Sequence, residues 1–178
     1  MIKIGATPAT IDTPIEHLMA CHRRIEQRLD TLVNAAAHLA GNPVEAERAI
    51  KQSFGFLDTS GVMHTADEEE SLFPRLLPLL SSSEIAFVES LEADHRVAQA
   101  VYEELKTLAE AMFADPVPQR IEPYRESAER LRGMYQRHIR TEDEILTALA
   151  RRSLSIAQIE QIADEMKARR AADRAALE

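Results

Sequence analysis

Cysteine, tryptophan and glycine are scarce in this chain of 178 residues, which contains one Cys, no Trp and five Gly. The single cysteine, Cys21, excludes an internal disulfide framework and a metal site built from several thiolates. Aromatic residues make up only 4% of the chain, which disfavours the strands of a β-sandwich or barrel. Ala, Leu, Glu and Arg are abundant instead, so the composition favours an all-α fold in a single domain spanning 1–178.

A surplus of positive charge and long apolar runs are also missing. The formal net charge is -9, so neither nucleic acid nor an anionic membrane surface is an expected partner. No apolar run approaches the roughly 18 residues of a transmembrane helix, and the first residues lack the charged-then-apolar pattern of a signal peptide. We therefore expect a protein of the reducing cytoplasm, and the sequence favours no particular oligomeric state.

Hydrophobic periodicity and capping signals predict four long helices and a shorter fifth one. Their expected starts are Thr13-Pro14-Ile15-Glu16, Asn42-Pro43-Val44-Glu45, Ser81-Ser82-Ser83-Glu84, a point between Pro118 and Pro123, and Ser155-Ile156-Ala157-Gln158. The short turns between them predict an up-down-up-down four-helix bundle over about residues 14–150, with a C-terminal helix over about 155–172. The charged last segment, ARRAADRAALE, is expected to fray.

Apolar stripes assign the inward face of each predicted helix. The stripe of the fourth helix includes Ile145, and that of the last helix includes Ile156. Pro74 and Pro78 fall near the end of the second helix and are expected to break it or reshape its end.

Four of the six histidines, His22, His64, His95 and His138, fall on the stripes of four different predicted helices. Glu68 and Glu142 each follow a histidine by four residues, which places both members of each pair on one helix face. His64 lies 42 residues after His22, and His138 lies 43 residues after His95. Each half is thus a hairpin of the form H…HxxxE, and pseudo-twofold packing of the halves would gather four imidazoles and two carboxylates.

Two divalent metal ions would explain why these groups occur on inward faces. Two buried glutamates are costly without cations, whereas ions that the carboxylates bridge remove this cost and leave each ion two imidazoles. Mixed nitrogen and oxygen ligation with open positions suits iron or manganese better than a closed zinc site. A lone histidine on an apolar face, or one HxxxE pair, is more often an ordinary structural feature. The prediction therefore rests on the six residues as a set, with a metal-free structural bundle as the alternative.

The same motifs resemble the hemerythrin-like domain, also called the HHE cation-binding domain. His22-Arg23-Arg24-Ile25-Glu26 is similar to its first motif, and the segment from His64 to Pro74, HTADEEESLFP, is similar to its second, HxxxEExxLFP. Asp94-His95 and His138-Ile139-Arg140-Thr141-Glu142 match the third and fourth, so the resemblance spans about residues 14–150. It implies a non-haem di-iron site bridged by the two glutamates, with other divalent metals as substitutes and a small diatomic molecule or peroxide as ligand.

Two positions differ from oxygen-carrying hemerythrins. Gln99 stands where those proteins have a further histidine, and Glu142 lies four residues after His138, where they place Asp at five. The chain thus resembles the four-His, two-Glu subgroup, which includes hemerythrin-like iron or oxygen sensors and the metal domain of iron-cluster repair proteins. The N-terminal cysteine-pair domain of those repair proteins is not among these residues. A ferritin-like di-iron bundle is disfavoured because neither half contains ExxH.

The resemblance implies sensing, storage or detoxification of oxygen, nitric oxide, peroxide or iron, and a di-iron oxidase, peroxidase or iron-centre repair enzyme is the alternative. His17 lies about 140° round the helix from His22 and is expected outside the site. His38, Glu69 and Glu70 are expected at the surface, and Cys21 in an inert buried position. The residues that could line the site are Glu26, Ser60, Gly61, Gln99 and Tyr135.

Overall fold

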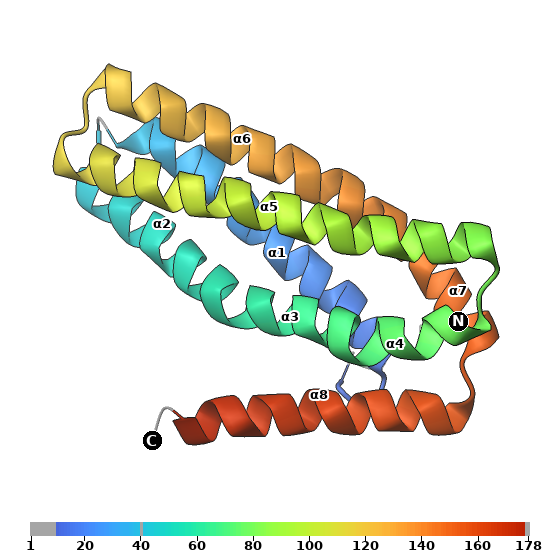
Figure 1. Ribbon diagram of the computed structural model, residues 1–178. Coiled ribbons are helices and arrows are strands. Elements are labelled where there is room, and N and C mark those ends of the chain that lie inside the picture. The colour runs from blue at the N-terminus through green and yellow to red at the C-terminus, as the bar shows by residue number, and fades with distance from the viewer. Residues whose placement is uncertain (1–9, 40, 177–178) are drawn as a thin grey trace, which may run out of the picture.

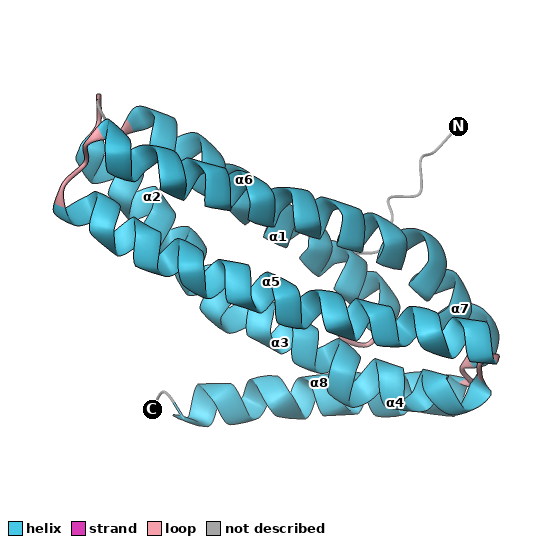
Figure 2. Ribbon diagram, turned by 45° about the horizontal axis from the view of Figure 1, so that its top comes forward, coloured by secondary structure: helices cyan, strands magenta, loops and turns pink. Residues whose placement is uncertain are grey.

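The computed structural model describes residues 10–39 and 41–176, and this part of the chain is helical with no β-strand (Figures 1 and 2). The elements in order are α1 (Pro14–His38), α2 (Pro43–Phe56), η1 (Leu57–Gly61), α3 (Val62–Ala66), η2 (Asp67–Leu72), α4 (Phe73–Leu76), η3 (Leu77–Leu79), α5 (Ser82–Ala114), α6 (Pro118–Thr141), η4 (Glu142–Leu146), α7 (Thr147–Ser153) and α8 (Ile156–Ala176). The short elements η1, η2 and η4 are π-helical turns, and η3 is a 3₁₀ turn. The all-α prediction is confirmed.

The described elements join into four helical rods that form the bundle, and Figure 1 shows how these rods lie side by side. The first rod is α1, the second runs continuously from α2 to η3, the third is α5, and the fourth runs from α6 to α7. α1 packs against α2 and α6, and α5 packs against α6. α8 lies outside these rods, where it contacts η2 and α1. Among the described residues, no helix is both long and apolar enough to cross a bilayer.

The helices begin where the capping signals predicted, but only two of the capping boxes form. The Ser81 N–H donates to the Glu84 carboxylate over 2.9 Å, and the Ser155 N–H donates to the Gln158 amide oxygen over 2.9 Å. Thr13 makes no cap because its hydroxyl donates to the carbonyl of Thr10. Asn42 makes none either, since its amide donates to the side chain of Glu45.

The two prolines of the second rod reshape it without breaking it. Pro74 occupies the first turn of α4, directly after the π turn η2, and a missing N–H is tolerated at such a position. Pro78 lies inside η3, and the rod ends only at Leu79. The bundle therefore keeps a long second rod through the segment that carries the HxxxE motif.

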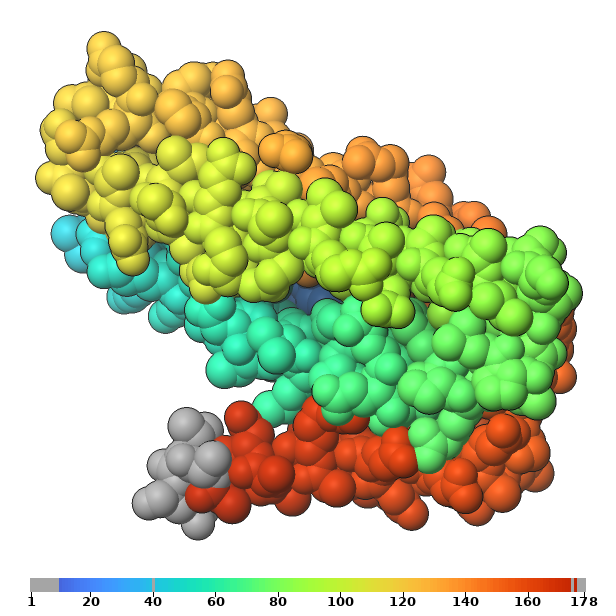
Figure 3. Space-filling model, in the orientation of Figure 1, coloured from blue at the N-terminus to red at the C-terminus, as the bar shows by residue number. Residues whose placement is uncertain are grey.

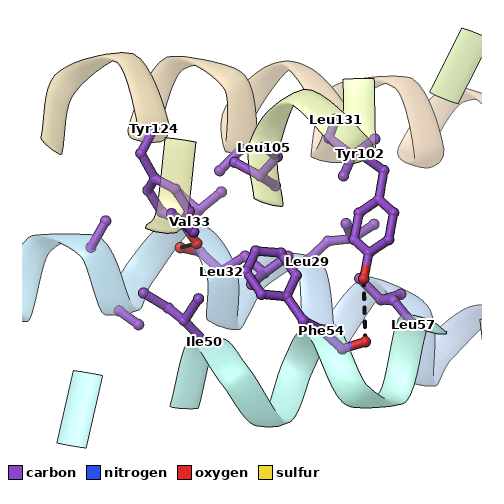
Figure 4. Packing of buried hydrophobic residues seen from close by; sticks show 14 of the residues in the cluster. Leu29, Leu32, Val33, Ile50, Phe54, Leu57, Tyr102, Leu105, Tyr124 and Leu131 are labelled. Atoms are coloured by element: carbon purple, nitrogen blue, oxygen red, sulfur yellow. Dashed lines mark hydrogen bonds between the residues drawn. The ribbon is translucent and has the colours of Figure 1, made fainter. Parts of the chain in front are cut away.

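Two apolar clusters fill the bundle at successive levels along the rods. The first, shown in Figure 4, includes Leu29, Leu32, Ile50, Phe54, Leu57, Tyr102, Leu105, Tyr124 and Leu131. The second includes Leu18, Leu72, Leu76, Val88, Leu91, Leu146 and Met166. On each rod the predicted metal ligands lie in sequence between residues of one cluster and residues of the other. The six polar residues thus form a layer enclosed by apolar packing at both ends.

Two inward assignments were wrong. Ile145 is 45% exposed while Leu146 is 3% exposed, because the π turn η4 moves the inward face by one residue. Ile156 is 80% exposed, because α8 packs on the bundle further along, through Ile162 and Met166. α8 continues to Ala176, so the charged segment expected to fray is helical over its described residues, and its last two residues lie outside them.

Candidate metal centre

The structure brings the six predicted ligands together in the buried polar layer. His22 comes from α1, His64 from α3, Glu68 from η2, His95 from α5, His138 from α6 and Glu142 from η4. Their ligand atoms fall into two groups, one of His22, His64, Glu68 and Glu142 and one of His95, His138 and Glu142. Within each group all the atoms lie within 4.8 Å of one another, so each group could hold a metal ion.

Both glutamates face histidines from the two groups. The oxygens of Glu142 lie 3.2 Å from His22 Nε2 and 3.0 Å from His138 Nε2. One oxygen of Glu68 is 3.8 Å from His22 Nε2, and the other is 3.6 Å from both His64 Nε2 and His95 Nε2. Each carboxylate therefore spans the two groups, as a bridging ligand would.

The orientation of these atoms tests whether metal ions fit. The four carboxylate oxygens are buried and make no hydrogen bond of good geometry with the described residues. His95 Nε2 and His138 Nε2 lie 2.9 Å apart and point at each other. Two imidazoles bound to one ion at about 2.1 Å and at right angles have nitrogens about 3 Å apart. Unpaired oxygens and converging nitrogens fit a pair of bridged metal ions better than a closed hydrogen-bond network.

Two acidic side chains bind the outer nitrogens of histidines in the layer. Asp143 lies 2.7 Å from His22 Nδ1, and Glu69 lies 2.8 Å from His95 Nδ1. An Nδ1–H that donates to a carboxylate fixes the ring and leaves Nε2 free to bind a metal ion. The expectation that Glu69 is solvated was therefore wrong, whereas Glu70 is exposed as expected.

Asp94 lies 3.6 Å from His138 Nδ1, too far for a hydrogen bond, and that nitrogen has no hydrogen-bond partner among the described residues. Sequence reasoning assigned no role to Asp94 or Asp143, although a signal was present. Each of the three acids is a chain neighbour of one predicted ligand and contacts a histidine on a different element, as Glu69 beside Glu68 contacts His95. Helix geometry points adjacent residues about 100° apart, so such a neighbour can reach the next rod.

Within the layer, protonated histidines balance the negative charge of Glu68 and Glu142. Burial acts to lower the pKa of His22, but Asp143 and the two glutamates outweigh it and raise that pKa to about 12. Burial acts to raise the pKa of Glu142, but the adjacent His138 and His22 hold it well below its usual value. Burial and the charge of Glu142 raise the pKa of Glu68 to about 6. Divalent cations would neutralise the same carboxylates in place of these protons.

Both glutamates lie where an α-helix changes into a π turn. Glu68 is the second residue of η2, and Glu142 is the first residue of η4. The two HxxxE motifs therefore share their backbone context as well as their spacing. Single π turns inside α-helices occur frequently at functional sites.

The two halves of the layer differ in their access to the surface. A hollow of about 320 Å³ separates α3 from α5 and is lined by residues that include Leu57, Gly61, Thr65, Glu69, His95, Gln99, Tyr102, Leu131 and Tyr135. A second hollow of about 90 Å³, between α5 and α6, reaches His95, Tyr135 and His138. Beside His22, Glu68 and Glu142 only about 10 Å³ is free. The His95–His138 half is thus the accessible one, and Figure 3 shows the larger opening between the α3 segment (teal) and α5 (yellow-green).

The remaining candidates lie at varied distances from the layer. His17 is outside it and contacts Arg170, His38 is exposed, and Cys21 is buried. Gln99 is exposed and donates to Glu103 over 2.6 Å, so its carboxamide does not enter the layer. Tyr135 lies beside His138, with ring centroids 6.4 Å apart, and lines both hollows. Gly61 lines the larger hollow, Glu26 a surface depression beside Asp143, and Ser60 neither hollow.

The fold and this layer define a helical bundle with a buried histidine–carboxylate cluster able to bind cations. The sequence matches the family model of the hemerythrin HHE cation-binding domain over residues 13–150. The chain therefore belongs to the hemerythrin HHE family. No curated protein matches it closely.

Proposed function

We propose that this protein binds two iron ions through His22, His64, Glu68, His95, His138 and Glu142, and that a small ligand reaches the centre from the side of His95 and His138. The observation that carries the proposal is the pair of buried glutamates, whose unpaired oxygens face imidazoles from all four rods. Membership of a cation-binding family also supports it. Bound iron would supply reversible redox chemistry and positions for oxygen, nitric oxide or peroxide.

The residues around the centre have separable tasks in this proposal. Asp143 and Glu69 orient His22 and His95, and the apolar clusters on both sides exclude bulk water. The hollow between α3 and α5 admits the ligand next to His95. Gln99 stays at the rim, so the accessible half has two histidines and shared carboxylates, which leaves room for a ligand. We expect this open half to favour one-way oxidation over reversible oxygen carriage.

Sensing, storage or detoxification of oxygen, nitric oxide, peroxide or iron is the role we favour. The size of the hollow supports an oxidase or peroxidase as the second candidate. Its volume of about 320 Å³ exceeds the space of a diatomic molecule several times over, since a liquid water occupies about 30 Å³. Steady-state turnover of hydrogen peroxide or of an organic reductant would favour this enzyme role over sensing or storage.

Metal analysis of protein produced in iron-supplemented medium tests the proposal directly. We expect about two iron ions per chain and visible absorption from the loaded protein. Replacing Glu142 or Glu68 with Ala should lose both ions together, because each carboxylate is assigned as a bridge, whereas Glu26→Ala should keep both. A colourless protein without iron would leave the structural bundle as the remaining interpretation. Full occupancy in either bridge variant would refute the bridging assignment.

A further inference from the structure

The C-terminal helix α8 lies outside the residues matched by the family and docks directly on the turn that carries Glu68. The family match ends at residue 150, and α8 runs from Ile156 to Ala176. It contacts η2, the π turn of Asp67–Leu72, and also α1. Figures 1 and 2 both show α8 alongside the α4 end of the second rod.

Asp67 is the centre of this contact. Its side chain is 0% exposed and directly precedes Glu68 in the chain. Arg170 binds both of its oxygens, with Nη1 3.2 Å from Oδ1 and Nη2 2.6 Å from Oδ2. Arg169 binds Oδ1 as well and donates to Ser71 Oγ over 3.2 Å. A buried carboxylate with planar, two-pronged partners of this kind is held in one orientation.

The two arginines are themselves fixed from several sides. Arg170 donates to the carbonyl of Met166 over 2.9 Å and lies 3.3 Å from His17 Nε2. Burial and the charge of Arg170 lower the pKa of His17, so its neutral ring can accept from the guanidinium. Arg169 also contacts Glu70 over 3.1 Å. The cluster of Asp67, Arg169, Arg170 and His17, which we call the α8 clamp, thus connects α8, η2 and α1.

We propose that Arg169 and Arg170 are positioning residues for Glu68, so that docking of α8 and binding of metal at the centre are coupled. The inference rests on the proposed metal-binding function. Asp67 and Glu68 belong to the same turn but face different ways. Asp67 points toward α8, where Arg170 binds it, and Glu68 points into the layer toward His22, His64 and His95. Fixing the first carboxylate restricts the backbone that aims the second.

The coupling acts in both directions. If α8 docking favours the geometry that binds metal, bound metal must favour α8 docking by the same factor. Metal removal should then loosen the clamp end of α8, while its Ile162 end stays packed in the apolar cluster. α8 would thereby report occupancy of the centre at the protein surface.

A charge-balanced variant tests the clamp without leaving a buried carboxylate unpaired. Asp67→Asn, Glu70→Gln, Arg169→Gln and Arg170→Gln are combined, which removes two acidic and two basic charges together, and the chain offers a matched control on the same helix. Arg75 and Glu165 form a further ion pair between α8 and the second rod, with Nη2 and Oε1 2.6 Å apart, so the control combines Arg75→Gln with Glu165→Gln. Each protein is loaded with Fe²⁺ without oxygen, and its transfer to a coloured ferrous chelator is timed.

We expect iron release from the clamp variant to be about 10- to 100-fold faster than from the unaltered protein, the usual range for groups that orient metal ligands. The control should release iron at close to the unaltered rate. Amide hydrogen exchange of the unaltered chain should be slower across residues 166–172 with iron than without it. This second measurement decides the matter even if the clamp variant fails to fold.

The outcomes separate the two proposals. Equal release rates for the clamp variant and control, or α8 exchange that ignores iron, would overturn the coupling while metal binding stands. An unaltered protein that takes up no Fe²⁺ would overturn the proposed function and the coupling with it.

Discussion

Carboxylates that accept a hydrogen bond from a histidine Nδ1 fix the orientation of that imidazole ring. Two of the four histidines, His22 and His95, have a hydrogen-bonded acidic partner on Nδ1, whereas Nδ1 of His64 and of His138 has no hydrogen-bond partner among the described residues. His22 has the shorter of these contacts, 2.7 Å to Asp143. The orientation of His22 should therefore depend most directly on its partner.

We predict that Asp143→Asn lowers metal affinity by about 10- to 100-fold, because an amide oxygen accepts from the imidazole more weakly than a carboxylate and makes the ring less basic. Competition with a chelator of known affinity measures the change. Glu144→Gln is the matched control. Glu144 is an exposed neighbour of Asp143, so this substitution removes the same charge and leaves the contact with His22 intact. Equal losses in both variants would show that overall charge, and not ring orientation, sets the affinity.

All six proposed ligands could be predicted from the sequence, because the apolar stripes placed the four histidines on inward faces and the i,i+4 spacing placed Glu68 and Glu142 beside two of them. The positions of their partners could not. Whether Glu69 points to solvent or to His95 depends on the rotation of the second rod about its axis, which packing determines. The same holds for Gln99, whose side chain turns along α5 to Glu103 and away from the layer.

At the scale of the elements, the π turns change which residues face inward. Periodicity of 3.6 residues placed Ile145 inside, yet the wide turn η4 places Leu146 there instead. A sequence window carries no direct signal for one extra residue in a turn, so this error followed from the period itself. The helix starts were predictable because Pro and the Ser81 box act locally.

This shift gives a direct stability test. We predict that Leu146→Ala lowers the free energy of unfolding by about 2 to 5 kcal/mol, the usual cost of truncating a buried leucine. Ile145→Ala should change it by no more than about 0.5 kcal/mol, because the side chain already meets solvent. Urea unfolding of the metal-free proteins measures both values. The opposite ranking would mean that the rod continues as a regular α-helix through Glu142.

The hollow between α3 and α5 offers a second test at this scale. A Cβ at Gly61 would meet only the Leu57 side chain, at 3.7 and 3.8 Å, which are ordinary contacts. We predict that Gly61→Leu fills part of the hollow and slows the reaction of the reduced, iron-loaded protein with hydrogen peroxide several-fold, as followed by stopped-flow absorption. Gly55→Leu is the control, because a Cβ there meets nothing within 4 Å. Unchanged rates in the Gly61 variant would place the access route elsewhere.

At the scale of the whole molecule, the buried carboxylates of Glu68 and Glu142 must be neutralised inside the bundle. Apolar clusters lie on both sides of it, so the fold must enclose two carboxylates whether or not metal is present. Without metal, protons on the histidines balance these charges, which makes the stability of the bundle depend on pH. Metal ions and protons compete for the same groups, so their effects on stability must oppose each other.

The sign of this competition follows from the directions of the pKa shifts. The pKa of His22 is raised to about 12, so its contribution to stability is complete below about pH 6.5 and is lost progressively as the pH rises. The pKa of His138 is raised too, because the adjacent Glu142 outweighs burial, so the contribution of His138 to stability is also lost as the pH rises. Glu142 has a lowered pKa, so its contribution is constant above about pH 4.5. The metal-free protein should therefore lose stability from pH 6.5 to 8.5, by up to about 1.4 kcal/mol per pH unit for each proton.

The loaded protein should behave differently, because metal binding releases these protons and grows tighter as the pH rises. We predict that the loaded form has the higher thermal midpoint throughout and that the gap between the two forms widens from pH 6.5 to 8.5. At free metal about 100 times the dissociation constant, binding alone adds about 2.7 kcal/mol. Thermal unfolding at three pH values, with iron and with excess chelator, measures the gap, and Glu26→Gln controls for loss of a nearby carboxylate outside the layer. Coincident midpoints would show that the folded bundle gains nothing from metal, and a gap that narrows with pH would show that protons and metal do not share these ligands.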